Sequence, residues 1–178
     1  MKIETTTIVR LRDALLQSGR RPSMVVSPAY ETLTRQGLLS PEETAALERV
    51  ESIGETMFLM MSADGEANAA EKDAIRGAIR GLTGNQLRSG TIDAMLANYA
   101  TRLEAQGREA RLQEVAECLS EIPLEAESAF ALSAAIALAD DEVAEEENQF
   151  INQLAEWFGL TPQRAEAILD ELDDDRSE

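Results

Sequence analysis

The chain has no histidine and only one cysteine among its 178 residues. Without histidine, neither a Ser-His-Asp triad nor a Cys-His pair can form, and histidine-ligated metal sites are excluded. A single cysteine excludes an internal disulfide and a thiolate zinc site. The remaining reactive side chains are almost all carboxylates, so the chemistry open to this protein is that of acidic groups.

Basic residues are also scarce, because 16 Lys and Arg stand against 34 Asp and Glu and give a net charge of -18. A surface with this charge repels a phosphate backbone, so no nucleic acid partner is expected. Aromatic residues make up 4 % of the chain, but 44 % hydrophobic and 28 % charged residues are typical of a folded protein. A chain of this length can bury a core as one domain or two small ones.

Long hydrophobic runs are absent as well. The longest uncharged stretch that we considered for a membrane span covers residues 128–139, well short of the roughly 20 residues that a bilayer requires. We interpret it as a buried central helix. Arg10, Arg12 and Asp13 interrupt the apolar residues of the amino terminus, which therefore does not have the pattern of a signal peptide. These features predict a cytoplasmic protein with no membrane insertion.

Apolar residues recur at helical spacing along nearly the whole chain, and no segment alternates as a strand does. The clearest helix start has Ser40 as N-cap, Pro41 at the first position and Glu43 at the third, and this helix is expected to run to Met61. Further apolar stripes predict helices around residues 74–82, 92–103, 112–122, 128–139, 150–158 and 162–172. The predicted fold class is all-α.

We expect three parts in the chain. Residues 1–40 carry a net charge of +3 and are interpreted as a basic helical extension packed on the body, residues 41–172 as an all-helical domain, and residues 173–178 as an acidic disordered tail. The arginines of the extension could pair with the acidic body or with an acidic partner; they are Arg10, Arg12, Arg20 and Arg21.

An acidic segment occurs twice in the chain, at an offset of 76 residues. Residues 63–71 align with residues 139–147, and each segment lies between an apolar helix and an amphipathic one. The coinciding positions are Ala63 with Ala139, Asp64 with Asp140, Glu66 with Glu142, and Glu71 with Glu147. The repeated unit is therefore a helix, a short acidic turn and a second helix.

Each turn could hold a hard divalent cation, because calcium, magnesium and manganese prefer oxygen ligands. The candidate ligands are Asp64, Glu66, Glu71, Asp140, Glu142 and Glu147. The spacing is not that of an EF-hand, since Ala69 and Ile75 stand where glycine and glutamate are required. The alternative is that the carboxylates only cap helices: Asn68 and Glu71 have capping-box spacing, and negative charge is favoured at a helix N-terminus.

The two turns, with the segment Trp157–Pro162 after the second, resemble the bacterial tellurite-resistance TerB-like family over roughly residues 41–172. The resemblance implies a TerB-like helical bundle with two pseudo-repeated helix-acidic turn-helix units. It also implies a non-enzymatic cytoplasmic module of stress response or signalling that binds divalent metal through the six carboxylates and docks with protein partners. The second turn departs from the family pattern, because Asp141 stands where glycine is usual.

Two other functions stay open from the sequence. A metal-independent helical adaptor would bind a basic protein partner through its acidic face, with both turns serving only as helix caps. Hydrolysis by paired carboxylates would be a third possibility, for which the sequence offers no evident substrate pocket. The sequence specifies neither the partner nor the oligomeric state.

Overall fold

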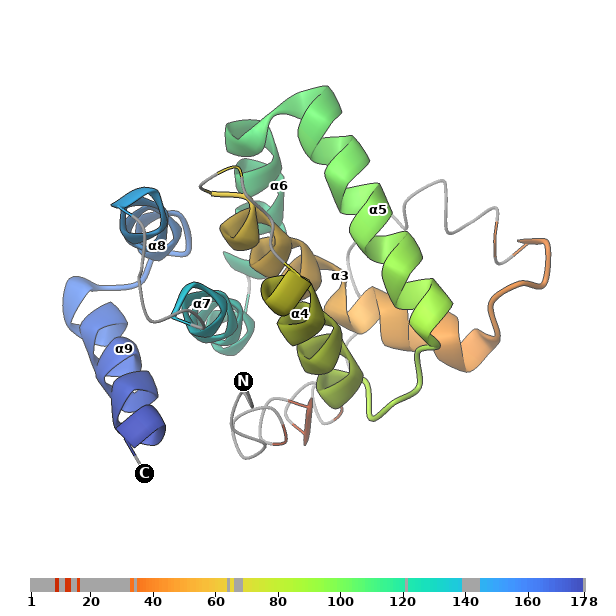
Figure 1. The fold of residues 1–178 in the computed structure, drawn as a ribbon, viewed down its shortest axis with the longest axis horizontal. Helices are drawn as coiled ribbons and strands as arrows, with labels where there is room; N and C mark the ends of the chain where they lie inside the picture. Colours follow the sequence, from red (N-terminus) through yellow and green to blue (C-terminus); the bar gives the residue numbers. More distant parts are fainter. Residues whose placement is uncertain are drawn as a thin grey trace.

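A computed structural model describes residues 9, 12, 13, 16, 33, 35–63, 65, 69–120, 122–138 and 145–177. Seven helices and no strand are found in these residues, which confirms the all-α prediction (Figure 1). None of these helices combines the length and the apolarity that a membrane crossing requires. The helices are α3 (Pro41–Met61), α4 (Ala69–Leu82), α5 (Ser89–Gln106), α6 (Arg108–Ser120), α7 (Pro123–Ala137), α8 (Glu145–Trp157) and α9 (Pro162–Ser177).

The start of α3 has the capping box that the sequence predicts. The backbone N–H of Glu43 donates to the Ser40 hydroxyl at 3.1 Å, and the Ser40 N–H donates to the Glu43 carboxylate at 3.2 Å. The same carboxylate accepts a hydrogen bond of 2.7 Å from Nε of Arg88, and this bond lowers the pKa of Glu43. Since Arg88 is the N-cap residue of α5, one buried carboxylate joins the beginnings of two helices.

Helix α3 lies at the centre of the fold and packs against α4, α5, α6, α7 and α8. Its most extensive contact is with α7, which also packs against α4, α6, α8 and α9. Figure 1 shows α3 passing through the middle of the molecule, with α4, α5 and α6 around it and α8 and α9 beyond α7. The apolar α7 is thus a buried central helix, as its composition predicted.

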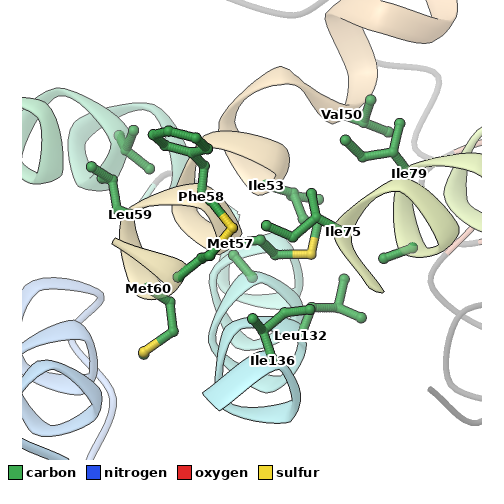
Figure 2. Packing of buried hydrophobic residues seen from close by; sticks show 14 of the residues in the cluster. Val50, Ile53, Met57, Phe58, Leu59, Met60, Ile75, Ile79, Leu132 and Ile136 are labelled. Atoms are coloured by element: carbon green, nitrogen blue, oxygen red, sulfur yellow. The ribbon is translucent and has the colours of Figure 1, made fainter. Parts of the chain in front are cut away.

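The core forms where α3, α4 and α7 meet. Figure 2 shows Ile53 and Met57 of α3 facing this interior together with Ile75 of α4 and Leu132 of α7. Met57, like its neighbours Met60 and Met61, is at most 1 % exposed, so the methionines of α3 are core residues. Full burial of one such side chain contributes about 1.5–3 kcal/mol.

A single residue, Gly107, separates α5 from α6. Its φ of +82° lies in the left-handed region that glycine enters without a steric cost, and its N–H closes the last turn of α5 on the carbonyl of Leu103. This short connection places α6 beside α5 and against α3.

The carboxyl end differs from the sequence prediction. Helix α9 continues to Ser177, whereas we expected residues 173–178 to form a disordered tail. No apolar residue follows Leu172. Extending an existing helix by one residue costs only the conformational entropy of that residue and gains one backbone hydrogen bond, so the helix can continue without apolar residues.

Most of the expected basic extension, residues 1–40, lies outside the described residues. Its described part contacts the body at several points: Leu33 packs against the core, and the carbonyl of Leu38 accepts a hydrogen bond from Arg88. Arg12 pairs with its neighbour Asp13 at 2.8 Å.

Candidate functional site

The two acidic segments connect helices with matching bounds. Helix α3 ends at Met61 and α7 at Ala137, while α4 begins at Ala69 and α8 at Glu145. The helix ends before the turns are separated by 76 residues, and so are the helix starts after them. In the first segment Gly65 has a φ of +85°, as expected for a turn glycine.

Four of the six candidate metal ligands, Asp64, Glu66, Asp140 and Glu142, lie outside the described residues. The other two, Glu71 and Glu147, are the third residues of α4 and α8. They are 4 % and 6 % exposed, so these two carboxylates are buried. Each has an interaction partner.

Helical geometry explains this burial. Residues four apart share one face of a helix, and the residues four positions after Glu71 and Glu147 are Ile75 and Ile151, both in the core. Each glutamate therefore lies on the inward face of its helix, in the first turn, where the backbone N–H groups and the helix dipole favour a negative charge.

The described residues alone do not provide a metal site, because they contain no cluster of three or more Asp, Glu, Cys or His side chains suited to hold an ion. A cation bound near Glu71 or Glu147 would need further oxygen ligands, and the other four candidates lie outside the described residues. In such a site, Glu71 and Glu147 would be the ligands contributed by the helices, and the turns would contribute the others.

The structure also contains a cluster that sequence reasoning missed, which we call the buried charge cluster: Glu51 and Glu55 of α3, Tyr99 and Arg102 of α5, and Arg111 of α6. Glu51 and Glu55 are 1 % and 2 % exposed. Arg102 bridges them, with 2.6 Å from Nη2 to Glu51 and 2.8 Å from Nη1 to Glu55.

Arg111 completes the cluster because it donates two parallel hydrogen bonds to the Glu55 carboxylate, one of 2.8 Å from Nε and one of 2.9 Å from Nη2. Its Nη1 donates to Gln106 at 2.7 Å and also to Glu114. The Tyr99 hydroxyl lies 3.2 Å from the Glu51 carboxylate and 3.1 Å from the Glu51 carbonyl oxygen. The two buried carboxylates are thus balanced by two guanidinium groups, and Arg111 also pairs with the exposed Glu114.

The pKa shifts follow from this arrangement. Burial raises the pKa of Glu51, and the charge of Arg102 opposes this only in part. Burial acts to lower the pKa of Arg111, but the hydrogen bonds and the charge of Glu55 outweigh it and raise the pKa. Because the carboxylates are occupied by arginines of two other helices, the cluster joins α3, α5 and α6.

The sequence carries a weak signal for this cluster, because residues 56–61 contain no charged side chain. In the structure every residue of α3 from Ile53 to Met61 is buried, so this half of the helix has no solvated face. Glu51 and Glu55, four residues apart at its beginning, therefore have to be buried with partners.

One further arginine connects the two hairpins. Nη2 of Arg108 donates to the carbonyl of Ser62, the C-cap residue of α3 that directly precedes the first turn. Its guanidinium carbon lies 5.5 Å from the ring centroid of Phe150 in α8, within the range of a cation–π contact. Arg108 thereby links the end of one hairpin's first helix to the other hairpin's second helix.

The fold and the turns define a class of protein: an all-helical domain in which two hairpins, each with an acidic connection, pack through α3 and α7. A family model described as "Tellurite resistance protein TerB" matches residues 51–170. The chain therefore belongs to the TerB family, as the resemblance of its turns predicted. The match includes both acidic segments but leaves out residues 1–50. Comparisons with curated proteins and with solved structures gave no match.

Proposed function

We propose that this TerB-family protein is a non-enzymatic module that binds divalent cations at its two acidic turns and acts through protein partners in a stress response or in signalling. One observation carries the metal proposal: Glu71 and Glu147 occupy the same position after the two turns and are both buried on the inward face of a helix. They give each turn one buried carboxylate in the first turn of the helix that follows it.

Charge supports a cation rather than an anion as the ligand. Each turn brings several carboxylates close together in sequence in a protein of net charge -18, and a cation relieves the repulsion between them. Calcium, magnesium and manganese are the candidates because the donors are oxygens. The proposed ligands are Asp64, Glu66 and Glu71 in the first turn and Asp140, Glu142 and Glu147 in the second.

Binding to the folded state alone would stabilise the protein by mass action. At a cation concentration one hundred times the Kd, the gain is about 2.7 kcal/mol. For a protein of this size, that free energy corresponds to a rise of about 5–10 °C in Tm. A cation that orders the turns would also change the surface offered to a partner.

The test is a thermal melt of the chelator-stripped protein with calcium, magnesium, manganese or zinc at about 1 mM and matched ionic strength. We expect a rise in Tm that depends on the identity of the cation. The rise should be reduced in Asp64→Ala and in Asp140→Ala, and absent in the double variant. The matched control is Glu146→Ala, which removes one negative charge from an exposed position of α8 and should keep the full rise.

The alternative function is a metal-independent adaptor that binds a basic protein through its acidic face. It is favoured by the placement of Glu71 and Glu147, because a carboxylate in the first turn stabilises a helix without a metal. A Tm that responds equally to all four divalent salts, in wild type and in the double variant, would refute metal binding at the turns. A basic partner bound with equal Kd in the presence and absence of chelator would then support the adaptor.

A further inference from the structure

A pocket of about 240 Å³ lies at the carboxyl end of α4, away from both acidic turns in the sequence. It is formed by three parts of the chain: the described residues of the amino-terminal segment, the middle of α3, and the turn after α4. The lining residues are Arg12, Leu16, Arg49, Leu82, Thr83, Gly84 and Gln86.

The lining is unusual for this protein because its described residues include two arginines and no carboxylate. The chain as a whole has about twice as many acidic as basic residues, 34 against 16. Two guanidinium groups from distant parts of the chain, Arg12 and Arg49, thus meet at one pocket of an acidic protein. This composition suits a negatively charged ligand.

The hydrogen-bonding groups of the pocket are mainly donors. Nη2 of Arg49 donates to the side-chain oxygen of Gln86 at 2.7 Å, which leaves the amide N–H groups of Gln86 and the other N–H groups of Arg49 for further acceptors. Arg49 forms no ion pair with a carboxylate in the described part of the chain. Arg12 donates to Asp13 through Nε and Nη2, and its Nη1 remains for a ligand.

The pocket also has apolar walls. Leu82 is 2 % exposed, whereas Leu16 is 55 % exposed and is one of the most exposed large hydrophobic side chains among the described residues. Gly84 adds no side chain, and the aliphatic part of Arg12 lies over it: a Cβ placed on Gly84 would be 3.9 Å from Cδ of Arg12. A ligand with an apolar part would cover Leu16.

We propose that this pocket binds a small amphipathic carboxylate, with its head group on Arg49, Arg12 and Gln86 and its tail between Leu16 and Leu82. A volume of about 240 Å³ admits a short-chain ligand such as hexanoate. Arg12, Leu16 and Arg49 lie outside the family match at residues 51–170, whereas the other four lining residues lie within it, so both arginines of the site come from outside the matched region. Ligand binding would hold the amino-terminal segment against α3 and α4.

The experiment is an NMR titration of the ¹⁵N-labelled full chain with sodium hexanoate up to about 20 mM at constant ionic strength, a range that covers Kd values near 1 mM. We expect saturable shifts of the backbone amides of residues 82–86 and of the Arg12 and Arg49 side-chain signals. Acetate has the head group alone and hexanol the tail alone, so both should bind at least about tenfold more weakly.

Two variants test the site directly. Gln86→Glu keeps the shape of the pocket but places a carboxylate beside Arg49, and it should abolish the hexanoate shifts in a folded protein. Arg49→Gln should raise the Kd about tenfold or more, because a charge-assisted hydrogen bond is lost. The control Arg80→Gln removes the same charge from an arginine that is near the end of α4, bonds to Ser89 and does not line the pocket; its Kd should stay within about twofold.

Three results would overturn the proposal: no saturable shift at the highest hexanoate concentration, equal binding of acetate and hexanoate, or equal weakening by Arg49→Gln and Arg80→Gln. The ¹⁵N spectrum of each variant shows whether it is folded. If Arg49→Gln is unfolded, hexanoate binding by a folded Gln86→Glu with wild-type Kd refutes the site by itself.

Discussion

Replacing Arg111 with methionine removes half of the positive charge from the buried charge cluster. Arg111 is 5 % exposed and donates two hydrogen bonds to Glu55. In the variant, Arg102 alone has to balance Glu51 and Glu55, which are both almost fully buried. One carboxylate charge then remains in the interior without a counter-charge.

Removing one partner of a buried ion pair costs about 3–5 kcal/mol, because the remaining charge has lost its solvation and its partner. The free energy of unfolding of a domain is about 5–15 kcal/mol, so Arg111→Met is expected to remove about a fifth or more of it. The matched control is Arg164→Met. Arg164 binds Glu127 with two similar hydrogen bonds, of 3.1 and 2.8 Å, but the side chains are 45 % and 29 % exposed. Its loss should cost at most about 1 kcal/mol.

A second variant separates charge from packing. In Arg111→Met combined with Glu55→Leu, the cluster again has one carboxylate, Glu51, and one guanidinium, Arg102. Replacing a buried ion pair with apolar side chains of similar size is often close to neutral, so the double variant should regain most of the stability lost in Arg111→Met. Urea unfolding followed by far-UV circular dichroism gives the free energies.

The electrostatic interpretation would be refuted if Arg111→Met cost no more than Arg164→Met. It would also be refuted if the double variant were less stable than Arg111→Met by the full cost of Glu55→Leu alone, since additive effects mean that the two residues are not coupled.

Two further predictions concern the surroundings of the cluster. Gly54→Ala would place a Cβ 2.8 Å from the Tyr99 hydroxyl and displace this hydroxyl, so urea unfolding should show a loss of about 1–3 kcal/mol. The control is Gly77→Ala in α4, whose Cβ would meet no atom within 4 Å and which should be neutral or slightly stabilising. Equal losses in the two variants would contradict the steric explanation. Because the pKa of Glu51 is raised above its usual value of 4.5, its contribution to stability is fully present below that value and declines as the pH rises through the raised pKa. Urea unfolding from about pH 4.5 to 8 should show this decline in wild type and a flatter profile in Glu51→Gln, and the opposite difference would contradict the raised pKa.

The helices of this protein could be predicted because their signals are local. Ser40, Pro41 and Glu43 specify the start of α3 within four residues, and Gly107 specifies the break between α5 and α6. The 76-residue offset also placed Glu71 and Glu147 at equivalent positions, which the helix bounds match. Local hydrogen bonding and helical periodicity are enough for these inferences.

The buried charge cluster could not be found in this way, because its pairs are formed between residues far apart in the sequence. Arg102 is 47 residues from Glu55, and Arg111 is 56 residues from it. A glutamate in an amphipathic pattern ordinarily belongs to a solvated face, and only the packing of α5 and α6 on α3 shows that Glu51 and Glu55 are enclosed.

The position of each candidate ligand decides which variants can test the proposed metal sites. Glu71 and Glu147 are buried in the first turns of their helices, so removing either carboxylate weakens a helix start whether or not a cation binds. Both the metal-binding function and the adaptor function predict a loss of stability in those variants, so such a loss does not distinguish between them. Asp64 and Asp140 precede the helices by several residues, and in the capping explanation their removal has no effect that depends on a cation. The diagnostic quantity is therefore the cation-dependent part of the Tm in Asp64→Ala and Asp140→Ala, measured against Glu146→Ala, because only metal binding makes that part depend on the two aspartates.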